Sequence, residues 1–175
     1  GDELTYTAQT LPGWLNFDLE TATISGTPTN DNVGDHAVVL LVTDNFGLTA
    51  EQSFAISVAN TNDAPVFTST PTTSAVEDAG YSYTAAASDI DIGDSLAFAA
   101  QTLPAWLNFD GTATISGTPL NEHVGTHEIL LTVSDLEGET DGQIFTINVA
   151  NTNDAPWFTS TPADSVLEDA EYSYQ

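Results

Sequence analysis

LPAWLNFDGTATISGTP, at residues 103–119, is a near copy of LPGWLNFDLETATISGTP at residues 11–28. The two copies differ in length because Leu19 and Glu20 of the first stand where the second has only Gly111. NTNDAP likewise occurs at residues 60–65 and again at residues 151–156, an offset of 91 residues (151 minus 60). Self-similarity at a fixed period is the signature of tandem structural repeats. The chain is therefore built from repeats of that length.

Short runs rich in Val, Ile, Thr and aromatic residues, separated by Gly, Pro, Asn and Asp, dominate each repeat. Such runs predict β-strands, and no segment has the period of a long amphipathic helix. In the complete repeat, the predicted strands cover residues 66–68, 81–87, 96–101, 107–109, 112–116, 126–134 and 143–150. About seven strands in about 90 residues is the pattern of an immunoglobulin-like sandwich. We therefore expect an all-β chain of tandem, seven-stranded Greek-key sandwiches.

The alignment of the copies predicts three units. Residues 1–60 form a repeat that lacks its first two strands, residues 61–151 form a complete repeat, and residues 152–175 supply the first two strands of another. The plain interpretation is a fragment cut out of phase from a longer array. A sharper hypothesis is that the C-terminal strands complete the first repeat of another copy, which would give head-to-tail assembly by strand addition.

The charge balance limits the partners of this chain. It has 26 Asp and Glu residues but no Lys, Arg or Cys, and 41% of its residues are hydrophobic. The hydrophobic residues are numerous enough to form a buried core. Nucleic acid and anionic lipid are excluded as partners, because binding them requires basic side chains. No apolar run is long enough to insert in a membrane. Two carboxylates about 5 Å apart repel by roughly 1 kcal/mol even in bulk water, so clustered acids need cations from solution.

Acids gather beside turns at repeated positions. Asp89, Asp91 and Asp94 alternate along SDIDIGD, and the junction string NTNDAP adds further oxygen donors. Ca²⁺ prefers six to eight oxygen ligands, including carboxylates, amide oxygens and backbone carbonyls. Each Asp or Asn taken alone is also a common turn former, because its side chain bonds to nearby backbone. The combination of the two strings at a repeat boundary favours a calcium site.

The whole chain resembles the bacterial cadherin-like repeats, including the dystroglycan-type cadherin and "putative Ig" families of large surface proteins. The motifs that carry the resemblance are LPxWLNFD, TATISGTP, the NVG or HVG turn, VTDNFG or VSDLEG, and NTNDAP. The resemblance implies cadherin-like sandwiches with Ca²⁺ between them. It assigns linker ligands to Asn60, Asn62 and Asp63, a DxD loop to Asp89 and Asp91, and a lone loop ligand to Asp135.

The same resemblance implies acids donated by the preceding repeat. Glu77 and Glu122 fit this role toward the second junction, and Asp31 fits it toward the first. The second linker offers Asn153 and Asp154, but the DxD loop that would face them is absent from the short third unit. We therefore expect a well-formed cluster at the first junction alone.

The remaining candidates are interpreted as structural. Trp14 and Trp106 are expected in the core, and Trp157, which replaces Val66 in the next repeat, is expected to pack as well. His36, His123 and His127 are too scattered for a metal site or a catalytic pair. We expect no enzymatic activity.

The sequence thus predicts a Ca²⁺-rigidified extracellular repeat module that acts as a spacer, stalk or filament segment of a large adhesin-type protein. Its expected partners are neighbouring repeats of the same protein, at the cell surface or in secreted form. The alternative is a carbohydrate-binding module that contacts glycans. It would require exposed aromatic residues along one sheet face.

Overall fold

The computed structural model describes residues 3–175 and consists of strands with two short 3₁₀ turns. The first repeat contains five strands and the turn η1 (Asn30–Asn32). Its strands are β1 (Leu4–Thr10), β2 (Leu15–Asp18), β3 (Thr23–Gly26), β4 (Gly34–Asp44) and β5 (Thr49–Val58). They form a three-stranded sheet in the order β1-β4-β5 and a two-stranded sheet of β2 and β3.

The second repeat contains nine strand segments and the turn η2 (Asn121–His123). The segments are β6 (Val66–Phe67), β7 (Ser74–Val76), β8 (Tyr81–Thr84), β9 (Ala87–Ser88), β10 (Ala97–Thr102), β11 (Leu107–Phe109), β12 (Thr114–Gly117), β13 (Gly125–Ser134) and β14 (Thr140–Ala150). Their sheets run in the orders β10-β13-β14-β7, β11-β12-β8 and β6-β9.

The predicted fold class is confirmed by this arrangement. The first strand is split into β6 and β7 and the second into β8 and β9, because each switches from one sheet to another along its length. Nine segments minus these two splits give seven strands. The prediction missed β7, which has three residues and pairs in parallel with the end of β14. So short a run carries no alternating pattern to reveal it.

The core of the second repeat lies between its two main sheets. Ile115, Ile129 and Ile147 have no exposed surface, and Tyr81 and Tyr83 from β8 close the core from one side. Trp106 is 8% exposed, as expected for a core residue, and its ring meets that of His127 edge to face at 5.8 Å. The histidine ring also contacts the carbonyl oxygen of His123 at 2.7 Å, so it has a structural role.

The core of the first repeat is more open. Val38 is its fully buried hydrophobic residue among residues 3–58, whereas Ile24, Phe54 and Ile56 are only half-buried. The reason is topological, since β3 and β5 each have a bare edge where β8 and β7 lie in the second repeat. Trp14 still meets His36 edge to face at 5.8 Å, so the aromatic pair of the other repeat recurs here.

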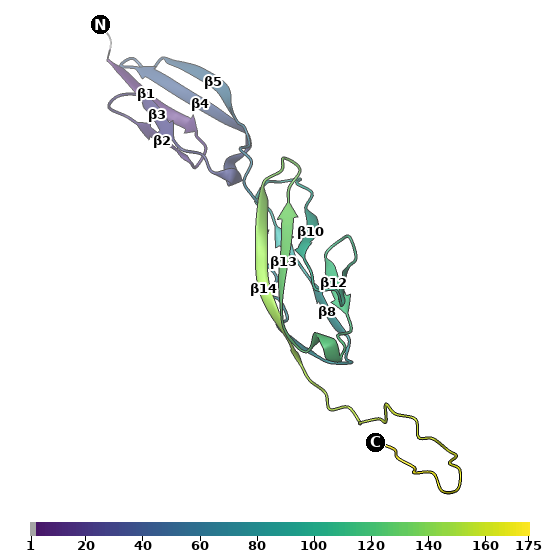
Figure 1. Cartoon of the computed structure of the whole chain (residues 1–175). Coiled ribbons are helices and arrows are strands. Elements are labelled where there is room, and N and C mark those ends of the chain that lie inside the picture. Colours follow the sequence, from purple (N-terminus) through teal and green to yellow (C-terminus); the bar gives the residue numbers. More distant parts are fainter. Residues whose placement is uncertain (1–2) are drawn as a thin grey trace.

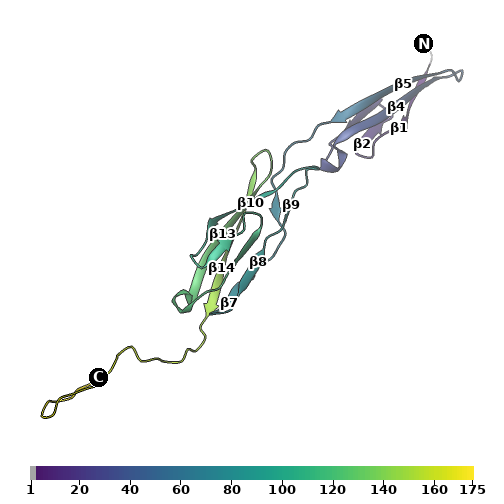
Figure 2. The same cartoon turned by 90° about the vertical axis from the view of Figure 1, so that its right-hand side faces the viewer.

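The two repeats and the tail, residues 151–175, follow one another along an elongated molecule (Figures 1 and 2). The tail contains no strand, and beyond Thr152, which hydrogen-bonds to Glu77, it extends away from both sandwiches. Trp157, which the sequence led us to expect in a packed position, is 77% exposed, because no sheet lies against the tail. Within residues 3–175, no helix has the length and apolar character needed to cross a bilayer.

Candidate metal centre

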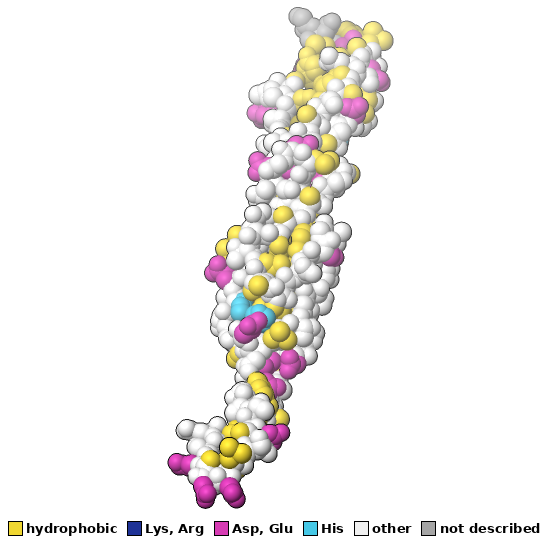
Figure 3. All heavy atoms as spheres, turned by 45° about the vertical axis from the view of Figure 1, so that its right-hand side comes forward, with side chains coloured by type: hydrophobic (Ala, Val, Ile, Leu, Met, Phe, Trp, Pro, Cys, Tyr) yellow, Lys and Arg dark blue, Asp and Glu magenta, His cyan; other side chains and the backbone are white. Residues whose placement is uncertain are grey.

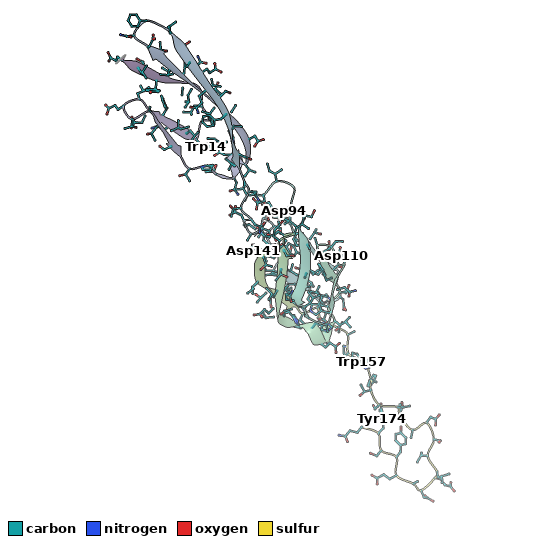
Figure 4. The ribbon with its side chains drawn as sticks, turned by 90° about the horizontal axis from the view of Figure 1, so that it is seen from above. Trp14, Asp94, Asp110, Asp141, Trp157 and Tyr174 are labelled. Carbon is teal, nitrogen blue, oxygen red and sulfur yellow. The ribbon has the colours of Figure 1, made fainter. Side chains whose placement is uncertain are left out.

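The loop between β9 and β10 carries three acids on a tight turn. Asp89 follows the last residue of β9, and its Oδ1 accepts a hydrogen bond from the backbone N–H of Asp91 at 2.9 Å. Gly93 has φ of +100°, a conformation that side chains other than that of glycine rarely adopt. The turn brings the chain back on itself, so that Asp94 lies near Asp89 where the two repeats meet (Figure 4).

Asp135 comes from the neighbouring turn, between β13 and β14. Its Oδ1 accepts hydrogen bonds from the backbone N–H groups of Gly138 at 2.6 Å and Glu139 at 2.8 Å. Its Oδ2 accepts one from the Asn62 side chain of the linker at 2.8 Å. Both oxygens are thereby held in place, and the carboxylate faces the end of the sandwich next to the first repeat.

Carboxylate oxygens from the two turns converge at this end of the second repeat. One oxygen each of Asp89, Asp94 and Asp135 lies within 4.8 Å of the other two. The buried atoms Asp89 Oδ2, Asp91 Oδ1 and Asp94 Oδ2 have no hydrogen-bond partner. Buried polar groups are normally paired, and an unpaired one is costly. Two of these residues, Asp89 and Asp94, belong to the converging trio, and this arrangement is one that can hold a positively charged ligand.

The electrostatics of the cluster are consistent with uncompensated negative charge. The pKa of Asp94 is raised above its ordinary value, first by burial and then by the charges of Asp89, Asp135 and Asp91. Burial also acts to raise the pKa of Asp135, but the Asn62 side chain and the backbone amides of its turn outweigh it, and the pKa is lowered. Asp135 therefore ionises more readily than an ordinary Asp, whereas burial and the neighbouring negative charges make ionisation of Asp94 less favourable.

The linker ties the cluster to the first repeat. The backbone N–H of Asp63 donates to Asp91 Oδ2 at 2.7 Å, and Asp63 Oδ2 accepts a hydrogen bond from the Asn30 side chain at 2.6 Å. Asp31, next to Asn30 in η1, lines a shallow hollow together with Asp63 and Ile90. The adjoining hollow is lined by Asn60. The predicted first-junction residues from both repeats and from the linker are thus neighbours.

The second junction is arranged differently. The Glu77 side chain is 2% exposed, and its Oε2 accepts a hydrogen bond from the backbone N–H of Thr152 at 2.9 Å. Asn153 and Asp154 are exposed in the tail, and exposed Glu122 has its Oε1 3.7 Å from Nε2 of His123. Over residues 3–175, Asp89, Asp94 and Asp135 are the one trio of acids or histidines that converges this closely. Glu77 therefore reaches the second linker, whereas Glu122, Asn153 and Asp154 are not brought together.

Two acids lie outside the ligand set that the resemblance implied. Asp94 belongs to the converging trio, and the third Asp of SDIDIGD was the signal for it. Asp44 repeats the geometry of Asp135 at the far end of the first repeat, where its Oδ1 accepts hydrogen bonds from Phe46 N–H at 2.9 Å and Leu48 N–H at 2.8 Å. The match of VTDNFG with VSDLEG could have identified it.

The donor set fits a hard cation. All its side-chain donors are carboxylate or amide oxygens, with no thiolate and no imidazole, and such a set favours Ca²⁺ or Mg²⁺ over softer metals. Donors from two turns and a linker suit the six to eight ligands and irregular geometry of Ca²⁺ better than the strict octahedron of Mg²⁺. The residues that would hold the ion are Asp89, Asp91, Asp94, Asp135, Asn62 and Asp63.

Comparison with known proteins gives a consistent result. The family model described as "Putative Ig domain" matches residues 1–59 and 64–150. The Serine-rich adhesin for platelets of Staphylococcus aureus strain MRSA252 is 32% identical over 147 residues, which is 83% of this chain and 10% of that protein. The homologous adhesin of strain MSSA476 has the same identity and coverage of this chain, which spans 6% of its length. The chain thus spans a tenth or less of these relatives.

Solved structures confirm the fold. Protocadherin Gamma B2 extracellular cadherin domains 1–5 align with a TM-score of 0.63 and 17% identity, over 91% of this chain and 34% of that one. The protocadherin GammaB4 extracellular domain aligns with a TM-score of 0.61 and 22% identity, over 91% of this chain and 28% of that one. The cadherin-like sandwich expected from the sequence is therefore the fold of this chain.

Proposed function

The chain belongs to the Putative Ig domain family, and from this we propose that it is a Ca²⁺-rigidified spacer module of a large adhesin-type surface protein. The observation that carries the proposal is the group of unpartnered, buried carboxylate oxygens of Asp89, Asp91 and Asp94, in a loop whose Asp91 accepts a hydrogen bond from the linker residue Asp63. A catalytic role is not proposed, because this group faces a linker rather than a substrate cleft.

The need for a cation follows from the composition. No Lys or Arg exists in the chain, so no basic side chain can neutralise these acids. On the face that Figure 3 shows, acidic side chains occur along the length of the molecule with no Lys or Arg among them. Ca²⁺, when bound, supplies the missing positive charge and attracts oxygens from both sides of the junction.

The linker residues determine how the junction would stiffen. Asn62 and Asp63 already contact Asp135 and Asp91 of the second repeat, and Asp63 also contacts Asn30 of the first. A short linker fixed at both ends has little freedom to bend. When Ca²⁺ binds, the attraction of each acid to the ion replaces the repulsion between the acids. This attraction would hold the geometry of the linker, and the elongated arrangement of the repeats would become a rod.

The adhesin similarity suggests where such a rod would serve. The staphylococcal relative is an adhesin for platelets by name, and this chain matches 10% of its length. We place the module outside the cell, where millimolar Ca²⁺ can fill sites of modest affinity. Its partners there are the neighbouring repeats, and its task is to hold another part of the protein away from the surface.

The glycan-binding alternative has less support. Trp14 and Trp106 lie against His36 and His127 instead of lining an open sheet face, and the exposed Trp157 and Phe158 belong to the tail, which contains no strand. A platform of exposed aromatic residues is the usual requirement for such binding. The spacer role needs no such platform.

The decisive experiment compares thermal unfolding in EDTA with unfolding after addition of Ca²⁺ or Mg²⁺. A site of the extracellular class, with Kd of about 0.1 mM, would gain about 2.7 kcal/mol at 10 mM Ca²⁺. For a domain of about 90 residues this raises Tm by about 11–22 °C. A Tm that is the same with and without EDTA would remove the metal from the proposal.

Asp94→Asn adds a test of the site itself. In EDTA the variant should melt at a higher temperature than the parent, because one of several crowded charges is gone. In Ca²⁺ it should melt at a lower temperature, because a ligand has been lost. Glu128→Gln, which removes an exposed acid on β13, is the matched control and should show no such reversal.

A further inference from the structure

One side of the second repeat ends in an unpaired strand edge. β10 pairs with β13 along one edge, and within residues 3–175 no strand pairs with its other edge. In an antiparallel pair, every second residue directs its backbone N–H and C=O away from the partner strand. β10 therefore presents a row of free donors and acceptors. Figure 1 shows β10 beside β13, running lengthwise in the repeat, so neighbouring repeats, which join at the ends, leave this edge free.

The edge of β10 lacks the features that protect two other edges of the repeat. Strand edges in proteins are commonly blunted by shortness, by charge or by Pro. β7 and β11 have three residues each and are directly followed by Glu77 and Asp110. β10 has six residues without Pro, and residues 95–109 contain no acid. A bulge disturbs the strand only beyond Ala100, so the edge before it is regular.

The first repeat presents the same edge. β1 is the counterpart of β10, with Thr7 at the position of Ala99, and among the described residues it pairs with β4 alone. Residues 4–17 contain no acid, and the bulge recurs at the same place, after Ala8. Because both copies have it, the uncharged edge is a property of the repeat itself.

The charge distribution indicates what can lie against this edge. The chain carries a formal net charge of −26, so a second copy is repelled from most of its surface. Figure 3 brings the right-hand side of Figure 1 forward, and there the middle of the second repeat shows hydrophobic and other uncharged atoms with acids toward its margins. A basic partner would be drawn to the acids instead. A second copy is the partner that can approach here without placing carboxylates against each other.

Two copies of this edge fit each other. Three of the six residues of β10 are alanines, at positions 97, 99 and 100, so little side-chain bulk hinders a close approach. The ring of Phe98 is turned toward Phe67, with ring centroids 5.9 Å apart, and is half-buried. In an antiparallel pair of identical strands, free N–H groups of each strand meet free C=O groups of the other.

We propose that the outer edge of β10 pairs antiparallel with the same edge of a second copy, so that two sandwiches share one continuous sheet. The contact is isologous, because both copies use the same strand. β1 offers an equivalent edge, so each repeat can hold a separate copy. The paired molecules run in opposite directions. If the chain has the spacer role proposed above, modules that project from two facing surfaces would meet in this orientation. The contact itself uses no cation.

The first test is sedimentation equilibrium of the chain in EDTA. One strand pair is about 20 Å long at 3.3 Å per residue, and contacts that bury less than about 1,200 Å² are weak. The measurement should therefore run from about 1 μM to about 1 mM, with monomer at the low end and a growing fraction of larger species. Raising NaCl from about 0.1 M to about 1 M should strengthen association, because the Debye length falls from about 10 Å to about 3 Å.

Two results of this measurement would overturn the proposal. One is a strict monomer at every concentration and salt level. The other is association that appears with Ca²⁺ and is absent in EDTA, since this would indicate ions that bridge acids of two copies. Because the assay is performed without Ca²⁺, its outcome is independent of whether the metal site exists.

Paired substitutions test the strands. Thr7→Asp combined with Ala99→Asp places a charge on each edge and should make the chain monomeric over the same range. The matched control combines Ala37→Asp with Thr126→Asp, which adds the same charge at exposed positions of the central strands β4 and β13. The control should still associate. Equal loss in both double variants would mean that total charge governs association, and the proposed pairing would be wrong.

Amide hydrogen exchange of the unsubstituted chain locates the contact and does not depend on how the variants fold. Pairing protects an N–H group in proportion to the paired fraction, so outward amides of β10 should exchange about ten times more slowly when about 90% of the chain is associated. The amides of β7 and β11 should exchange at the same rate in dilute and concentrated samples. Slower exchange at β7 or β11, with β10 unchanged, contradicts the proposal.

Discussion

Gly117 offers a sharp test of how closely the neighbouring strands β11 and β12 approach, because it pairs with Leu107 in the same sheet. A Cβ at this position would lie closer than 3.0 Å to the carbonyl oxygen of Trp106, and 3.3 Å from the Cα of Leu107. Both atoms are backbone, so no side-chain rotation relieves the clash. Overpacking of this kind costs about 3 kcal/mol, near the upper end of the usual range. Gly117→Ala should therefore lower the Tm of the repeat by about 12–24 °C.

Gly142→Ala is the matched control on β14. Its added Cβ would meet only Leu130 Cδ1, at 3.8 Å, which is ordinary van der Waals contact. Replacement of a strand glycine at a tolerant site stabilises by about 0.4–1 kcal/mol, so Tm should rise by a few degrees. Thermal unfolding followed by near-ultraviolet circular dichroism, which reports on Trp106, measures both variants. Shifts of the same sign would refute the reasoning.

Three further results are expected. Ile115→Ala should lower the free energy of unfolding, measured with denaturant, by about 2–5 kcal/mol. Ile24→Ala should lower it clearly less, because Ile115 is fully buried whereas its counterpart Ile24 is half-buried. Equal losses in the two variants would contradict the open core of the first repeat. Burial, followed by the charge of Tyr83, raises the pKa of Tyr81 to about 12 from 10.0. The stability that protonated Tyr81 adds is complete below pH 10 and should be lost as the pH rises toward 12. Tyr81→Phe should remove this fall in Tm, measured from about pH 9 to about pH 12. Backbone N–H groups of Thr112 and Thr114 lower the pKa of Asp110 below 3.8, so the stability that Asp110 adds above that pH should be lost on acidification, and the Tm difference from Asp110→Asn should shrink from pH 6 to 2.

The fold could be predicted from the sequence because the repeat supplies its own comparison. Trp106 and Ile115 lie in copies of one motif, and their alternation with polar residues identifies the inward face of each strand. The sequence could not show where a strand switches sheets. β7 and β9 are two or three residues long, and their pairing depends on the tertiary position of β14 and β6.

The candidate site was predicted in part. Asp89 and Asp135 lie 46 residues apart (135 minus 89) in the sequence, and it was the resemblance that placed them on neighbouring turns. Asp94 joins them because a positive-φ glycine reverses the loop, which a residue pattern alone does not specify. Burial of Trp157 was wrong for a related reason, since its packing depends on sheets beyond its own strand.

The converging acids all belong to the second repeat, and the linker is attached to them through Asn62 and Asp63. The first repeat is joined to that assembly through the side chain of Asn30. We expect tension along the chain to break the Asn30 contact first, so that the upstream module separates while Asn62 and Asp63 stay attached to the downstream module. A string of such modules would then give way at one junction at a time, with each linker staying on the module that follows it.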